Sequence, residues 1–439
     1  MPGAPRNPAS GGDRGRSVAL YAPAWPPGLV HNGIVTYVGQ ISPALARHGV
    51  RTHIVVPSDV STPADPEVVD FTKLSFPIAR QLLFRAIEKV PQLRQTGLHL
   101  GWEIAEAMAV VRERHGLDLI EMEETLGAAW FVQDLFAAVP VVVRLHGPWF
   151  VNGTALGVPR DAEFRRREAI ERLCITEAVG LTSPSADLLG RVRREYGLAL
   201  AHAAVIPNSA PRIAPERRWT LEACDKKTVL FVGRFDRHKG GDVAIEAFAA
   251  LARKLPNVEM AFVGPDRGFR DDAGKIHDIS SFLEQRLPPA IRARVQVRGA
   301  LPADQIEALR RQAFVTVVAS RYENFSLALL EALSFGCPTI ASATGGNGEI
   351  VLADRTGLTF VAADASDLAA QMLALFENPL RAAELGHQAA LDMEQRLSPD
   401  AVARATLDYY QAVWNAAPPR RSRGPRDLHR ALYQLSGLV

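Results

Sequence analysis

Short apolar runs that alternate with longer amphipathic stretches are the feature that most restricts how this chain of 439 residues can fold. Most of the runs are apolar along their whole length, as expected of strands that are covered on both faces. The stretches between them place apolar residues at helical spacing, for example Val38, Ile41 and Leu45. The alternation predicts an α/β protein with parallel sheets. The twelve predicted strands cover residues 18–22, 52–56, 118–122, 139–145, 179–182, 204–206, 228–232, 259–263, 294–297, 315–319, 338–341 and 357–361.

Twelve strands are too many for one doubly wound domain of this length, so we expect a break between two units. Residues 207–225 hold several prolines and then polar residues before a new strand begins. Ligands of such sheets bind beyond the carboxyl ends of the strands, and two facing sheets would form a cleft that can hold two substrates. The predicted division is a Rossmann-like domain over 18–210 completed by a helix over 399–416, a linker over 211–226 and a second Rossmann-like domain over 227–395.

The formal net charge of +2 is distributed unevenly along the chain. Residues 1–17, which we expect to be a disordered leader, carry +2, and residues 417–439 form a basic tail of +4, so the body between them carries −4. A body of this sign is poorly suited to binding nucleic acid. The tail has two interpretations, a solvated segment or a contact with an anionic membrane surface.

Targeting signals are not visible in the sequence. Residues 1–17 lack the apolar centre of a signal sequence, and no run reaches the roughly 18 apolar residues of a spanning helix. The three cysteines are widely spaced and fit a reducing compartment better than a metal site. We therefore expect a cytoplasmic protein, either free or peripheral at the inner membrane face.

The segment VLFVGRFDRHKGGD, residues 229–242, places two cations after a predicted strand. The strand ends at Gly233, Arg234 and Lys239 follow, and two glycines that allow close backbone approach precede a predicted helix. Taken alone, such residues are usually solvated. In this combination they can stabilise a diphosphate leaving group as its charge develops. The segment contains neither a P-loop nor a dinucleotide-binding glycine motif.

A second segment, residues 320–342, predicts an anion site at the start of a helix. Ser326 is the expected N-cap of a helix from about 327 to 335, and the free amides there would meet the same diphosphate. Glu323 lies in the preceding loop, where it can accept hydrogen bonds from sugar hydroxyls. Glu331, on the second turn among apolar neighbours, can hold a ribose diol, although an ordinary surface charge is the alternative.

The spacing Gly-Arg-x4-Lys-Gly, together with Glu-x7-Glu inside ENFSLALLEALSFGCP, resembles the retaining family-4 glycosyltransferases of the GT-B fold. The resemblance covers roughly residues 17–416 and is most specific in the second half. It implies two Rossmann-like domains facing across a cleft, with Arg234 and Lys239 on the donor diphosphate, Glu331 on the ribose and Glu323 beside the donor sugar. It also implies donor contacts from Gly233, Asn324, Phe325, Ser326 and Leu327.

Segments of the first half resemble the same family more weakly. HNGIVTYVGQ, residues 31–40, resembles its glycine-rich loop, which brings Gly33 near the donor phosphate or the acceptor. VVVRLHGPWF, residues 141–150, makes His146 the candidate beside the transferred sugar, with a structural hydrogen bond as the alternative. VIPNSA, residues 205–210, resembles the entry to the interdomain hinge. Acceptor contacts are assigned to Glu121, Glu123 and Trp149, with Phe150 beside them; core packing is the alternative for the two aromatic residues.

The resemblance implies transfer of a sugar, with retention of anomeric configuration, from a nucleoside diphosphate donor. We expect a UDP-sugar first and GDP-mannose second, and a saccharide or lipid-linked saccharide acceptor in cell-envelope polysaccharide synthesis. No Asp-x-Asp motif at a strand end would hold a metal on the diphosphate, so we expect neither a metal nor another cofactor. The alternatives are a sugar-nucleotide epimerase, a phosphorylase of the same fold, a glycosyltransferase acting on small natural products and a non-catalytic sugar-binding module.

Overall fold

The computed structural model describes residues 15–28, 32–61, 67–74, 89, 97–135, 139–271 and 273–416. The predicted basic tail and residues 1–14 of the predicted leader lie outside them. Arg16 and Ser17, which the sequence placed in the leader, belong to the first domain instead. The Ser17 amide donates to Asp118 at 2.8 Å, while the Arg16 guanidinium lies 3.2 Å from the same carboxylate and over the Trp414 ring.

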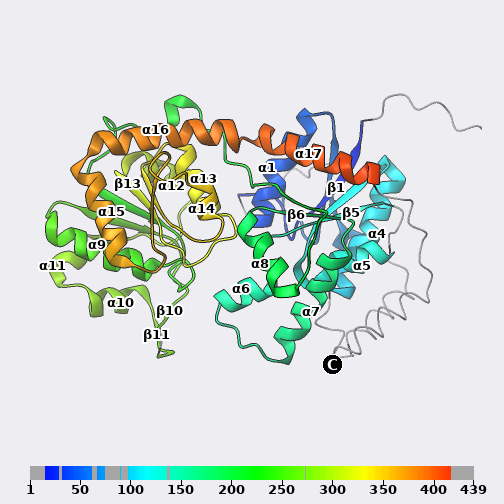
Figure 1. The fold of residues 1–439 in the computed structure, drawn as a ribbon, viewed down its shortest axis with the longest axis horizontal. Coiled ribbons are helices and arrows are strands. Elements are labelled where there is room, and N and C mark those ends of the chain that lie inside the picture. The colour runs from blue at the N-terminus through cyan, green and yellow to red at the C-terminus, as the bar shows by residue number, and fades with distance from the viewer. Residues whose placement is uncertain are drawn as a thin grey trace, which may run out of the picture.

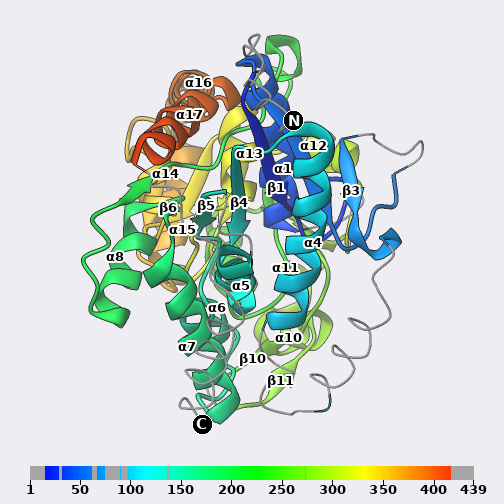
Figure 2. The same ribbon diagram turned by 90° about the vertical axis from the view of Figure 1, so that its right-hand side faces the viewer.

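The first domain is built on a sheet of seven described strands, all parallel, in the order β3-β2-β1-β4-β5-β6-β7. The short edge strand β3 was not predicted, because three half-buried residues carry no periodic signal. Helices cover both faces of the sheet, and Figure 2 shows α4 in front of it. The strands are β1 (Ser17–Tyr21), β2 (Arg51–Val56), β3 (Val68–Asp70), β4 (Leu119–Glu123), β5 (Val141–Arg144), β6 (Gly180–Ser183) and β7 (Ala203–Val205). The helical segments are α1 (Gly33–Arg47), η1 (Phe71–Lys73), α4 (Leu98–His115), η2 (Thr125–Gly127), α5 (Ala128–Leu135), α6 (Trp149–Ala155), α7 (Ala162–Glu177) and α8 (Ala186–Tyr196).

The second domain repeats this plan with six described parallel strands in the order β12-β9-β8-β13-β14-β15. The two-residue strands β10 and β11 pair antiparallel as a hairpin, which was not predicted from the sequence. The strands are β8 (Thr228–Val232), β9 (Glu259–Val263), β10 (Phe269–Arg270), β11 (Ile276–His277), β12 (Val295–Val297), β13 (Val315–Val318), β14 (Thr339–Ser342) and β15 (Leu358–Phe360). The helical segments are η3 (Pro215–Arg217), α9 (Gly241–Lys254), α10 (Ile279–Arg286), α11 (Pro289–Arg292), α12 (Ala303–Gln312), α13 (Leu327–Ser334), α14 (Asn347–Ile350), α15 (Ala365–Glu377) and α16 (Pro379–Arg396).

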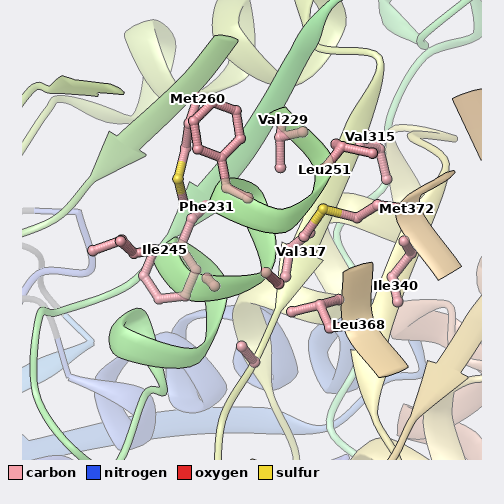
Figure 3. Packing of buried hydrophobic residues seen from close by; sticks show 14 of the residues in the cluster. Val229, Phe231, Ile245, Leu251, Met260, Val315, Val317, Ile340, Leu368 and Met372 are labelled. Atoms are coloured by element: carbon pink, nitrogen blue, oxygen red, sulfur yellow. The ribbon is translucent and has the colours of Figure 1, made fainter. Parts of the chain in front are cut away.

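Both faces of β8 are buried, which explains why its sequence is apolar throughout. Val229 and Phe231 pack on one face with Ile245 of α9 and Met372 of α15 (Figure 3), while Leu230 joins a separate cluster on the other face. Strands of this kind need a layer of helices on each side. The predicted fold class, two Rossmann-like domains with parallel sheets, is therefore confirmed.

The last described helix, α17 (Pro399–Ala416), returns to the first domain. It follows α16 along one side of the molecule (Figure 1) and packs on α1, where the Arg47 guanidinium donates to Asp400 at 2.9 Å. Its Tyr410 hydroxyl donates to the buried Glu121 carboxylate at 2.9 Å. The first domain therefore takes part of its core from the far end of the described chain. No described helix is long and apolar enough to cross a membrane.

Direct contacts also join the two domains at the edges where their strands end. The Glu349 carboxylate of α14 accepts hydrogen bonds from the Ala186 and Asp187 amides at the start of α8, each at 2.8 Å. The Tyr322 hydroxyl donates to the Asp187 side chain at 3.0 Å, and the Arg191 guanidinium lies 4.1 Å from the centre of the Tyr322 ring. We call this set of contacts the interdomain latch.

Candidate active site

The loop from Gly233 to Gly240 is pressed against neighbouring strand ends. Gly240 has a φ of +69°, and a Cβ atom there would lie 1.9 Å from the Ala319 carbonyl oxygen. Gly264, after β9, has a φ of +144°, and its Cβ would lie 2.0 Å from the Gly233 carbonyl oxygen. Only glycine tolerates such approaches, so the sequence fixes this loop at the carboxyl edge of the sheet.

Both predicted cations of this loop are engaged by carboxylates. The Lys239 ammonium lies 2.5 Å from an oxygen of Glu323, and the Arg234 guanidinium lies 2.6 Å from Asp236. The other Asp236 oxygen accepts the Lys239 amide at 2.8 Å, which ties the loop to itself. The Arg234 side chain stays partly exposed, and Lys239 joins the end of β8 to the end of β13.

Glu323 is a buried carboxylate that carries its charge at neutral pH. Burial alone would raise its pKa, but Lys239, His238 and the hydrogen bonds from Lys239 and Ser320 hold that pKa below its ordinary value. The Ser320 hydroxyl donates to it at 2.7 Å. The side chain is therefore ready to accept hydrogen bonds from hydroxyl groups.

The start of α13 lies directly after Glu323. Ser326 is the N-cap, as predicted, and its buried hydroxyl accepts the Leu329 amide at 3.4 Å. Phe325 packs in a cluster beneath the helix, and Leu327 opens the helix half-buried. The amides of this first turn provide the positive end of the helix dipole.

A glycine pair that sequence reasoning missed supports this loop. A Cβ at Gly345, where φ is +53°, would lie 2.2 Å from the Glu323 carbonyl oxygen, and one at Gly346 would lie 2.1 Å from that of Asn324. The Gly346 amide donates to the Glu323 carbonyl at 2.8 Å. Two adjacent glycines, the first of which lies four residues after a predicted strand, were the available signal.

Glu331 is half-buried among its apolar neighbours. Its carboxylate lies 2.6 Å from the guanidinium of Arg310, whose side chain is only 1% exposed, whereas that of Glu331 is 44% exposed. One oxygen of Glu331 is thus fixed from within the protein. Its proposed contact with a ribose remains a prediction.

The first domain brings its own loops to this edge. A Cβ at Gly33, the first residue of α1, would lie 3.9 Å from the Leu327 side chain, so the starts of α1 and α13 face each other. The Asn324 side-chain amide donates to the His146 carbonyl at 2.9 Å. Gly147, with a φ of +133°, bends the chain around that amide. The structure therefore brings Gly33, His146, Asn324 and Glu323 to one place.

His146 holds a neutral imidazole. Burial and the nearby Arg144 guanidinium lower its pKa to about 3, and the ring meets Tyr37 edge-on at 5.4 Å between centroids. At neutral pH the ring can donate or accept a hydrogen bond but carries no charge. The lowered pKa therefore favours a role as a neutral hydrogen-bonding group for this side chain.

Glu124, a residue that sequence reasoning missed, holds the His146 loop from behind. Its buried carboxylate accepts the His146 amide at 2.9 Å and the Gly147 amide at 2.7 Å. Burial, with Glu123 and Glu171 nearby, raises its pKa to about 8. Glu171 in turn accepts the Trp149 amide at 2.5 Å. The acidic run at the end of β4 was the only sequence signal for this support.

Two family models match the chain and adjoin each other. Residues 31–210 match the model for Glycosyltransferase Family 4, and residues 214–392 match the model for Glycosyl transferases group 1. The chain is a family-4, group 1 glycosyltransferase. The boundary between the two matches falls between the two sheets: the first model covers β2 to β7, and the second covers β8 to β15.

Curated relatives extend over nearly the whole glycosyltransferase. The D-inositol 3-phosphate glycosyltransferase of Arthrobacter sp. (strain FB24) is 26% identical over 87% of this chain and 90% of its own length. The glycogen synthase of Mycobacterium tuberculosis is 26% identical over 88% of this chain and 92% of its own length.

Solved structures share the fold at low sequence identity. Sucrose-phosphate synthase from Thermosynechococcus elongatus superposes with a TM-score of 0.67, at 22% identity over 92% of this chain and all of its own. Anabaena HepE in complex with UDP and glucose gives a TM-score of 0.64, at 18% identity over 90% of this chain and 99% of its own. The GT-B arrangement predicted for this glycosyltransferase is therefore confirmed.

The residues of this glycosyltransferase that were predicted to contact the acceptor differ in how deeply they are buried. Glu121 is wrong as a cleft residue, because both of its oxygens are taken inside the protein by the hydroxyls of Tyr37, at 2.8 Å, and Tyr410. Glu123 is also buried, accepts the Thr125 hydroxyl at 2.5 Å and has its pKa raised to about 7, chiefly by burial.

The two aromatic candidates differ in exposure. Phe150 is buried and meets the Tyr196 ring edge-on at 5.4 Å, which favours the core-packing alternative for most of its surface. Trp149 stays half-buried, with the Arg167 guanidinium 3.8 Å from its ring centre. Trp149 therefore remains a candidate for acceptor contact. Within the described ranges, no group of three or more histidine, cysteine, aspartate or glutamate side chains is arranged to hold a metal ion.

Proposed function

We propose that this glycosyltransferase moves a hexosyl group, with retention, from a nucleoside diphosphate sugar to a saccharide or lipid-linked saccharide acceptor in cell-envelope polysaccharide synthesis. A UDP-sugar is the first candidate donor and GDP-mannose the second. The observation that carries the proposal is the pairing of Lys239 with a charged, buried Glu323 beside the first turn of α13. HepE, with the same fold, has been solved with UDP and with UDP-glucose, which supports a uridine nucleotide.

Each group has a role in the proposed reaction. Lys239, Arg234 and the amides that open α13 balance the charge that develops on the departing diphosphate. Glu323 accepts hydrogen bonds from hydroxyls of the donor sugar, and neutral His146 offers another from the opposite domain. Glu331 binds the ribose of the donor. Positive charge from the protein takes the place of a metal, so activity in EDTA is expected.

Retention follows a front-face route in this proposal. The acceptor oxygen bonds to the anomeric carbon on the face from which the diphosphate leaves. The bond between that carbon and the phosphate oxygen breaks, and the acceptor proton passes to the departing phosphate. No side chain then has to act as a nucleophile.

Removal of Lys239 tests the assignment of the diphosphate site. Turnover of Lys239→Ala should fall at least ~100-fold, the scale for one lost transition-state electrostatic contact. Lys254→Ala, at the exposed far end of α9, is the matched control and should turn over normally. The measurement is release of nucleoside diphosphate under steady-state conditions. Near-normal turnover by Lys239→Ala would remove the proposal.

The donor and the reaction type need separate measurements. UDP should raise the melting temperature more than GDP or ADP does, because a ligand that binds only the folded state stabilises it. Incubation with donor alone distinguishes the main alternative. Slow hydrolysis of the donor is expected of a transferase, whereas an epimerised donor would identify the chain as a sugar-nucleotide epimerase.

A further inference from the structure

A pocket of about 480 Å³ lies at the interdomain boundary, and neither Lys239 nor Glu323 lines it. One wall is α6, from which Phe150 contributes, and another is α8, with Arg191, Arg194 and Glu195. Tyr322 of the second domain closes one side. The volume falls within the range of pockets that hold small molecules. None of these groups except Phe150 was singled out by the sequence.

Three guanidinium groups and one carboxylate line this pocket, and Glu168 adds a carboxylate that interacts with Arg160 and Glu195. Arg160, Arg191 and Arg194 line it, against the single carboxylate of Glu195. Arg160 makes a long, exposed pair with Glu195 at 3.4 Å, and the bond from Arg191 to Asp187 uses only its Nε. Across the described ranges, no carboxylate lies within 4.0 Å of the exposed Arg194 guanidinium. Guanidinium forks bind phosphate oxygens in pairs, so the pocket offers a site for a phosphate group.

Tyr322 and α6, which line two sides of the pocket, are each close in sequence to residues of the candidate active site. Tyr322 directly precedes Glu323, and α6 begins at Trp149, three residues after His146. The latch contacts of Tyr322 with Asp187 and Arg191 hold Tyr322 against α8. A molecule seated between α6 and α8 would therefore reach toward the side of Glu323 that faces the first domain.

We infer that this pocket is the acceptor subsite and that its arginines select an acceptor carrying a phosphate group. The inference rests on the proposed function, because an acceptor is needed only if the chain transfers a sugar. The phosphate sits against Arg194 and Arg191, and the rest of the acceptor extends along α6 toward His146. A soluble sugar or polyol phosphate and a lipid-linked phosphosaccharide share this chemistry.

Binding of paired probes tests the inference. Calorimetric titrations in the presence of UDP compare inositol 3-phosphate with inositol, and glucose 6-phosphate with glucose. At least one phosphorylated probe should bind at least about tenfold more tightly than its parent, as expected for a charge-assisted contact. Arg194→Ala should remove that difference and leave UDP affinity unchanged, whereas Arg194→Lys should keep part of it. Arg253→Ala, exposed on α9, is the matched control.

The outcomes separate this inference from the proposed function. Equal binding of every phosphorylated probe and its parent, or full discrimination by Arg194→Ala, would overturn the pocket assignment even if UDP binds and Lys239→Ala is inactive. Absence of binding by both UDP and GDP would instead defeat the proposed function. A further arm offers a phosphosaccharide headgroup free in solution or anchored in a lipid vesicle. Arg194-dependent transfer to either one supports the inference, and the better substrate identifies the source of the phosphate.

Discussion

Replacing Glu349 with glutamine should shift this glycosyltransferase toward a conformation in which the two domains separate. The carboxylate of Glu349 caps α8 across the boundary through two hydrogen bonds of 2.8 Å, to the amides of Ala186 and Asp187. It also places a negative charge at the positive end of that helix. Ser185 caps α8 from within the first domain, so the helix itself remains capped when Glu349 is changed.

The size of the effect follows from these contacts. A hydrogen bond to a charged group is worth about 1.5–3 kcal/mol when well shielded. Glu349 is half-buried, and glutamine keeps one acceptor oxygen, so the lower end applies. We expect a loss of about 1–2 kcal/mol, which corresponds to a 5- to 30-fold fall in the ratio of closed to open molecules. The substrate-free enzyme should show the change most clearly, because donor and acceptor add contacts of their own.

Single-molecule energy transfer between a dye on α7 and one on α15 measures this ratio. Introduced cysteines can be labelled selectively, because Cys174, Cys224 and Cys337 are all buried. Glu377→Gln, on the exposed end of α15, is the matched control and should leave the distance distribution unchanged. Identical distributions for the wild type and Glu349→Gln would refute the reasoning, as would an equal shift in the control.

Two further predictions concern stability. Gly240→Ala should lower the free energy of unfolding by about 1–3 kcal/mol, because its Cβ would overlap the Ala319 carbonyl at a positive φ. Thermal melts measure this loss. Gly348→Ala, where the added atom meets open space, is the control and should show no such loss. The pKa of Glu124 is raised to about 8 in the folded state, so this carboxyl group favours folding when protonated, and that contribution is lost as pH rises from about 4.5 through 8. Glu124→Gln should flatten the decline of unfolding free energy with pH in denaturant titrations from pH 5.5 to 8.5, and curves parallel to those of the wild type would contradict this.

Local signals in the sequence predicted much of the fold and of the donor side. Strands buried on both faces could be recognised because their sequences are apolar throughout. Ser326 could be assigned as an N-cap because a cap depends on its immediate neighbours. Gly240 likewise indicated a close backbone approach, but the sequence did not show that the neighbouring group is the Ala319 carbonyl. Short elements such as β3 and the hairpin of β10 and β11 carry too few residues to show a period.

The acceptor side depends on partners far away in the chain. Glu121 and Glu124 lie three residues apart, and nothing in their spacing tells them from acceptor ligands. The Tyr410 hydroxyl donates a hydrogen bond to Glu121 from 289 residues away, and the His146 amide donates one to Glu124 from 22 residues away. The latch contact between Glu349 and Ala186 spans 163 residues. Such assignments need the packed structure, because tertiary contacts decide which carboxylates stay open to a ligand.

The return of α17 to the first domain has a consequence for synthesis of the chain on the ribosome. The first domain emerges early, yet Glu121 lacks the Tyr410 hydroxyl until residues 399–416 have been translated and have left the exit tunnel. The second domain, whose strands and helices are contiguous in the chain, can complete its core before then. The first domain, although it is translated first, would therefore complete its core after the second domain.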